Sequence, residues 1–179
     1  MPNKHILFLL SGSVACFKAC EVISALVAQG HEVQTAVTPQ ALQFIGEHTL
    51  QGLTHRPVYK DMFAPRQSGT EHISLTTWAD VTVLCPATAN ILGKMAAGIG
   101  DDCVSTLFLA HSFSKPFLVA PAMNTAMYQH PATQSAMAKL QKWGVQFIAC
   151  GTGRLACGVQ GEGRLAEPTT ILEKINVYL

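Results

Sequence analysis

The 179-residue chain is apolar for its size: 49% of its residues are hydrophobic, 13% are charged, and the formal net charge is +1. With so little charge and no basic run, the sequence argues against nucleic acid or an anionic membrane surface as a partner. No stretch approaches the roughly 20 consecutive apolar residues of a membrane span, so we expect a soluble protein whose apolar excess is partly covered by sister subunits.

Short apolar runs alternate along the chain with longer helical segments, which is the pattern of an α/β fold with a parallel sheet. The uninterrupted apolar run 6–10 is typical of a parallel strand that is buried on both faces. Further strands are predicted at 32–37, 81–85, 117–120 and 145–149. Helices are predicted at 14–28, 39–45, 89–98, 102–110, 131–143 and from about 168 onward.

Two regions lack this pattern. Residues 46–71 contain Pro57, Pro65 and Gly69, and we expect loops there with one short strand at most. Residues 151–163 contain five glycines, which predicts a mobile flap rather than a packed element. Because no linker or repeat interrupts the chain, we predict a single domain over residues 1–179, a three-layer α/β/α Rossmann-like fold with its ligand at the carboxyl ends of the strands.

The six cysteines do not indicate a secreted disulfide scaffold in a chain of this length. Cys16 and Cys20 lie one helical turn apart, but no nearby histidine or second cysteine pair completes a site, and we expect no bound metal. The thiols are expected to be reduced and the protein to be cytoplasmic.

Two loops have features of a cofactor site. After the first strand, Gly12 permits a tight turn, and the free N–H groups at the following helix start favour an anionic group such as a phosphate. An ordinary strand-to-helix turn would have the same appearance, because the three-glycine dinucleotide fingerprint is missing. In the second loop, Pro86 is expected to end the strand that reaches Cys85, and Asn90 offers an amide that would equally serve as a helix cap.

The segment Pro121–Tyr128 places the carboxamide of Asn124 just beyond a strand, where it is suited to a substrate carboxylate. Met123 and Met127 have the spacing of one helix face and are equally explained by packing.

Two further side chains are candidates for proton transfer. His72 follows the irregular region, and imidazole titrates near neutrality, although it is only one of seven histidines. Cys157 lies among glycines, unlike the thiols in regular elements; a disulfide with Cys150, or no role at all, are the alternatives.

These motifs, in this order, closely resemble those of the flavin-dependent cysteine decarboxylases, and most of all the FMN enzymes of coenzyme A biosynthesis. Two positions depart from the family pattern: Ile91 stands where a threonine is usual, and Tyr128 where a tryptophan is usual. The resemblance implies a bound FMN. The cofactor contacts that it implies are Gly12, Ser13, Val14, Thr38, Thr88, Ala89, Asn90, Ile91 and Ala122.

The resemblance also implies roles in catalysis. His72 would be the base of an oxidative half-reaction, Asn124 would bind the substrate and orient its carboxylate, and Cys157 would donate a proton in a reductive half-reaction. Arg154, Leu155 and Ala156 would line the substrate. Whether Arg154 or Arg164 pairs with a substrate phosphate stays open, since either guanidinium would bind such oxygens bidentately.

The implied reaction converts 4′-phospho-N-pantothenoyl-L-cysteine to 4′-phosphopantetheine and CO2 by flavin oxidation to a thioaldehyde, decarboxylation to an enethiolate and re-reduction. The alternatives are a peptidyl-cysteine decarboxylase of lantibiotic maturation, which stops at the enethiol, a flavin prenyltransferase, and a non-catalytic FMN-binding regulator. The resemblance further implies a homotrimer, or a dodecamer of four trimers, with FMN at the subunit interface and the substrate made by a separate synthetase.

Overall fold

The computed structural model describes residues 3–64, 69–154 and 160–179, and its centre is a parallel sheet with the strand order β2-β1-β3-β4-β5. The strands are β1 (His5–Leu10), β2 (Glu32–Val37), β3 (Val81–Ala87), β4 (Phe117–Pro121) and β5 (Gln146–Phe147). All pairings within this sheet are parallel. Because the order reverses between β1 and β3, the crevice between their carboxyl ends is where a ligand is expected.

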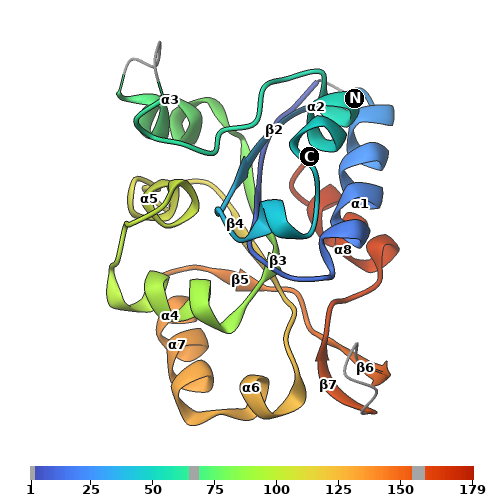
Figure 1. Ribbon diagram of the computed structural model, residues 1–179, viewed down its shortest axis with the longest axis vertical. Helices are drawn as coiled ribbons and strands as arrows, with labels where there is room; N and C mark the ends of the chain where they lie inside the picture. The colour runs from blue at the N-terminus through green and yellow to red at the C-terminus, as the bar shows by residue number, and fades with distance from the viewer. Residues whose placement is uncertain (1–2, 65–68, 155–159) are drawn as a thin grey trace.

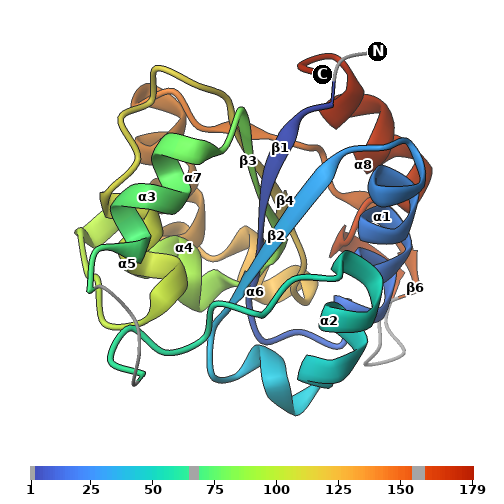
Figure 2. The same cartoon turned by 90° about the horizontal axis from the view of Figure 1, so that it is seen from above.

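Helices cover both faces of the sheet (Figures 1 and 2). One face carries α1 (Cys16–Ala28), α2 (Glu47–Thr54) and α8 (Pro168–Asn176). The other carries α3 (Glu71–Trp78), α4 (Ala89–Ala97), α5 (Cys103–Leu109) and α7 (Pro131–Lys142). This three-layer arrangement confirms the predicted fold class. Within the described ranges, no helix combines the length and the apolarity needed to cross a membrane.

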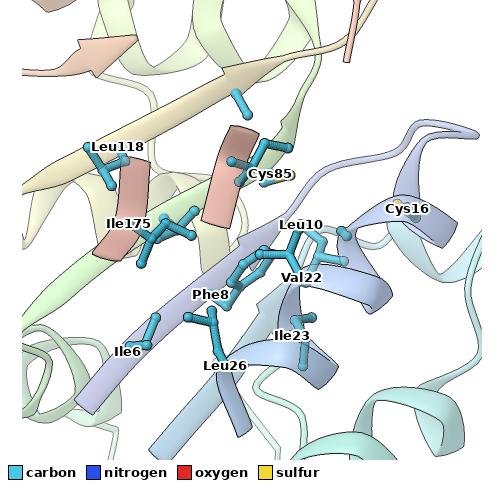
Figure 3. Close-up of a cluster of buried hydrophobic side chains, with 14 of the residues drawn as sticks. Ile6, Phe8, Leu10, Cys16, Val22, Ile23, Leu26, Cys85, Leu118 and Ile175 are labelled. Carbon is cyan, nitrogen blue, oxygen red and sulfur yellow. The ribbon is translucent and has the colours of Figure 1, made fainter. Parts of the chain in front are cut away.

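Strand β1 is buried on both faces, as its apolar run predicts. Residues 6–10 are each 0% exposed. Phe8 packs with Ile23 of α1 (Figure 3), whereas Leu9 packs with Leu92 of α4 in a second cluster on the opposite face. Since successive strand residues point to opposite faces, one strand contributes to both cores.

The predicted strands and most helices are confirmed, but three expectations in the first half of the chain were wrong. Residues 47–54 form helix α2 where loops were expected. The sequence did not predict this helix because its buried residues, Leu50 and Thr54, are too few to give a helical period. Strand β3 runs through Pro86 to Ala87, and the pairing with β4 shifts register there, so the proline sits at an irregularity that tolerates a missing N–H. The helix expected at 39–45 is only a short 3₁₀ turn, Ala41–Gln43.

The glycine-rich region, expected as a mobile flap, instead contains the antiparallel strands β6 (Gly151–Arg154) and β7 (Gln160–Arg164). Strand β7 packs on the short helix α6 (Thr125–Gln129). Gly163 has φ +103°, and a Cβ there would lie 2.6 Å from the carbonyl oxygen of Met123. Glycine at this position therefore serves close packing in a left-handed conformation rather than mobility.

Replacing Phe8 with alanine should lower the free energy of unfolding by roughly 3–5 kcal/mol, because it empties a fully buried site on the central strand. The same deletion at Phe63, which is 87% exposed, should cost less than about 0.5 kcal/mol. Denaturant unfolding of both variants measures the difference. An equal loss of unfolding free energy in the two variants would contradict the burial of β1 at the centre of the fold.

Candidate active site

One buried serine joins the loops on either side of the crevice between β1 and β3. Ser11 is 2% exposed, and its hydroxyl donates to the carbonyl oxygen of Pro86 at 2.7 Å. The Oγ of Ser11 also accepts from the N–H of Thr88 at 3.0 Å. These bonds fix the spacing of the two loops. Sequence reasoning missed this role, since a hydroxyl after a strand is too common a feature to single it out.

The start of α1 offers unused backbone donors beside this crevice. Among the described residues, the N–H groups of Gly12, Ser13 and Val14 donate to no protein acceptor, whereas the N–H of Ala15 donates to the Ser13 hydroxyl at 3.2 Å. A Cβ on residue 12 would lie 2.6 Å from that of Gln40, so only glycine fits this packing. Free N–H groups at the start of a helix fit the phosphate of a cofactor.

The loop after β2 reaches the same edge of the sheet. Thr38 is buried, its N–H donates to the carbonyl oxygen of Leu10 at 3.0 Å, and its hydroxyl accepts from the N–H of Ala41 at 3.3 Å. Its side chain is thus held beside the end of β1, where the sequence placed a cofactor contact.

The structure of the loop after β3 shows which residue caps helix α4, a question that the sequence left open for Asn90. Thr88 is the N-cap of α4, and its hydroxyl accepts from the N–H of Ile91 at 3.4 Å. Asn90 is therefore not the cap, and it is exposed, while Ala89 is half-buried. The side chain of Ile91 is 1% exposed and lies in the core, so any cofactor contact at this position would come from its backbone.

The loop after β4 carries Asn124. The N–H of Ala122 donates to the carbonyl oxygen of Ala87 at 2.9 Å, which continues the pairing of β3 and β4 beyond the strand end. Asn124 then caps α6, because its Oδ1 accepts from the N–H of Met127 at 2.8 Å. Within the described part of the chain, Nδ2 has no acceptor, and this donor is available to a carboxylate.

A half-buried thiol, that of Cys150, contacts this loop. The Sγ of Cys150 lies 3.5 Å from the carbonyl oxygen of Pro121. Burial raises the pKa of Cys150 to about 11, so the thiol is protonated at neutral pH. Cys150 is a free thiol, and its alternative disulfide partner Cys157 lies outside the described residues.

The hairpin of β6 and β7 is attached directly to the Asn124 loop. The N–H of Met123 donates to the carbonyl oxygen of Gly163 at 2.9 Å, and the hydroxyl of Thr125 donates to that of Glu162 at 2.9 Å. The predicted site residues Leu155, Ala156 and Cys157 lie outside the described residues, as does the side chain of Arg154.

Arg164 is engaged within the protein. Its guanidinium pairs with the carboxylate of Glu167 at 2.9 Å, and the same carboxylate pairs with Lys18 of α1 at 2.9 Å. A Cβ on Gly153 would lie 2.9 Å from Nη1 of Arg164, so this side chain lies against β6. The Arg164 guanidinium is therefore already paired with a carboxylate within the chain.

His72 lies in the first turn of α3 and is half-buried. The other end of α3 is at the amino edge of the sheet, where the N–H of Asp80 donates to the carbonyl oxygen of His5 at 2.8 Å. The first turn of α3, with His72, therefore lies towards the carboxyl edge. However, α3 and α6 lie at opposite ends of the long axis of the molecule (Figure 1). One chain thus brings together the Asn124 loop and the hairpin, but not α3.

Comparisons with known proteins agree with this arrangement. A family model described as Flavoprotein matches residues 1–178. The chain is 41% identical over 174 residues to the coenzyme A biosynthesis bifunctional protein CoaBC of Bacillus subtilis (strain 168), covering 97% of this chain and 42% of that protein. It is also 41% identical over 178 residues to a probable phosphopantothenoylcysteine decarboxylase of Streptococcus mutans, covering 99% of both. The chain therefore spans less than half the length of the bifunctional relatives.

Solved structures give the same result. A phosphopantothenoylcysteine (PPC) decarboxylase variant complexed with pantothenoylaminoethenethiol superimposes with a TM-score of 0.90 at 32% identity, over 99% of this chain and 98% of that one. The FMN binding protein AtHal3 has a TM-score of 0.86 at 33% identity, over 99% and 97% of the two chains. The chain belongs to the flavoprotein family, its resemblance to the flavin-dependent cysteine decarboxylases is confirmed, and a flavin is the class of cofactor that these findings support.

Ser11→Ala should lower the free energy of unfolding by roughly 1–3 kcal/mol, because the N–H of Thr88 loses its acceptor and the Pro86 carbonyl keeps only its bond from the backbone N–H of residue 11. It should also weaken flavin retention, since the side chain of residue 11 would no longer link the loops that follow β1 and β3. Flavin fluorescence after dialysis and urea unfolding of the flavin-free protein measure the two effects. Ser74→Ala, on the exposed side of α3, is the matched control. Unchanged retention in Ser11→Ala would refute the role given to Ser11.

Proposed function

We propose that the chain is an FMN-dependent phosphopantothenoylcysteine decarboxylase, which converts 4′-phospho-N-pantothenoyl-L-cysteine to 4′-phosphopantetheine and CO2. The observation that carries the proposal is the attachment of the Asn124 loop to the β6–β7 hairpin at the carboxyl edge of the sheet. A free amide donor for the substrate carboxylate thereby lies beside the strands that flank the Cys157 segment. The relative in Streptococcus mutans, similar over its whole length, supports the same reaction.

FMN would be held at the carboxyl ends of β1 and β3. Its phosphate would be held by the N–H groups of residues 12–14, and its remaining contacts would come from Thr38, Thr88, Ala89, Asn90 and Ala122. The similarity to an FMN binding protein supports FMN over other flavins. When bound, the flavin accepts two electrons from the cysteine side chain of the substrate and returns them after CO2 is lost.

The protein supplies binding and proton transfer around this redox chemistry. Nδ2 of Asn124 donates to the substrate carboxylate and orients it for departure, while Arg154 pairs with the phosphate. His72 removes a proton during oxidation, and Cys157 returns one to carbon during reduction.

The separation of α3 from α6 makes a second copy of the chain part of the proposal. His72 of one copy would complete the site that contains Asn124 of another, within a trimer or a dodecamer of trimers. Large apolar side chains near the crevice are exposed in the single chain and would be covered by such a partner: Val14, Phe17 and Phe44. A single domain, a separate synthetase and a cytoplasmic location complete the proposal, the last supported by the free thiols of all five described cysteines.

Incubation of the flavin-loaded protein with phosphopantothenoylcysteine should yield CO2 and the saturated thiol, while a peptide ending in cysteine should be left unchanged. His72→Asn should release no CO2. Cys157→Ser should release CO2 but accumulate the enethiol, which is two hydrogens lighter, because only the final protonation is lost. Cys150→Ser, a thiol outside the proposed chemistry, should still give the saturated thiol.

Mass spectrometry of the products, with a CO2 assay, separates these outcomes. Decarboxylation of the peptide alone would overturn the proposal in favour of a peptidyl-cysteine decarboxylase. Saturated product from Cys157→Ser would refute the role given to that thiol.

A further inference from the structure

The hairpin of β6 and β7 meets the Asn124 loop through one side-chain hydrogen bond. The hydroxyl of Thr125 donates to the carbonyl oxygen of Glu162 at 2.9 Å. Thr125 directly follows Asn124, and Glu162 lies in β7, which follows the segment that contains Cys157. The bond therefore joins the loop proposed to hold the substrate to the strand next to the proposed proton donor.

The packing around this bond leaves little freedom for the hairpin. A Cβ on Gly161 would lie 2.1 Å from the hydroxyl oxygen of Thr125, and one on Gly163 would lie 2.6 Å from the carbonyl oxygen of Met123. Both surfaces are in contact only because β7 has no side chain at these two positions. A small change at Thr125 or Gly161 should therefore displace β7 from the loop.

The Thr125 hydroxyl has no other use among the described residues. The cap of α6 is provided by Asn124, whose Oδ1 accepts from the N–H of Met127, so helix α6 does not depend on Thr125. Within the part of the chain that the structure describes, the one hydrogen-bond partner of the hydroxyl is the Glu162 carbonyl oxygen. Its contribution is thus confined to the junction between the loop and the hairpin.

We propose that Thr125 is a positioning residue that couples the two halves of the reaction by fixing β7 on the Asn124 loop. This inference rests on the proposed function. The enethiol becomes the saturated thiol by gaining two electrons from the reduced flavin together with protons, of which Cys157 supplies the one on carbon. Loosening the junction slows this last proton transfer, whereas CO2 release, which needs His72 and Asn124, continues. The enethiol then leaves before it is reduced.

Thr125→Val keeps the shape of the side chain and removes the donor. It should raise the ratio of enethiol to saturated thiol by about three- to ten-fold, which corresponds to the loss of one hydrogen bond, with CO2 release within about two-fold of the wild type. Gly161→Ala disturbs the same contact from the other side and should shift the ratio in the same direction. Thr125→Ser keeps the hydroxyl and should restore the wild-type ratio.

Thr54→Val, the same exchange at a buried threonine of α2, should leave the ratio unchanged. The products are quantified by mass spectrometry beside Cys157→Ser as the reference for full enethiol release. A wild-type ratio in both Thr125→Val and Gly161→Ala would overturn the inference, as would a parallel loss of CO2 and thiol. Absence of CO2 from the wild-type protein would instead defeat the proposed function itself, so the two failures are distinguishable.

Discussion

The whole carboxyl edge of this protein depends on the burial of β1 between β2 and β3. Residues 6–10 have no exposed surface, and the chain leaves this strand directly into Ser11, whose hydroxyl bonds to both the Pro86 carbonyl and the Thr88 N–H. Because parallel strands end at the same edge, the loops that follow β1, β3 and β4 are brought together. The bond between Ala122 and Ala87 extends this order to the loop that carries Asn124.

Two side chains at this edge, those of Asn124 and Thr88, cap helices and leave amide groups free to bind a ligand. Asn124 uses its oxygen to cap α6 and keeps its N–H donors for a ligand. Thr88 caps α4, which leaves the Asn90 amide exposed at the edge of the crevice. Since the caps hold the backbone of both loops in place, the free groups are oriented before any ligand binds, which reduces the entropy lost on binding.

Local sequence signals predicted the sheet and most of the helices. The apolar run of β1 and the family-like motifs around Pro86 and Asn124 were long or specific enough to be interpreted. Short elements were missed, because α2 and α6 bury too few side chains to give a helical period. Glycines at 161 and 163 predicted mobility, whereas the structure uses them for close packing, a distinction that depends on which atoms lie opposite.

The position of His72 relative to Asn124 was the hardest feature to predict. Both residues were expected at one edge of the sheet, but their separation along that edge is set by the strand order and by which face α3 covers. No local pattern encodes whether such a gap is closed by another copy of the chain. The role of Cys157 stays a prediction, because it lies outside the described residues.

The most direct test of a site shared between copies is complementation of two inactive variants. His72→Asn lacks the proposed base, and Asn124→Asp keeps a helix-capping oxygen but opposes the substrate carboxylate with a negative charge. In randomly mixed assemblies, about a quarter of the interfaces would unite an intact His72 with an intact Asn124. Co-expression should therefore restore about a quarter of the wild-type rate of CO2 release from phosphopantothenoylcysteine. A mixture no more active than either variant alone would contradict the account.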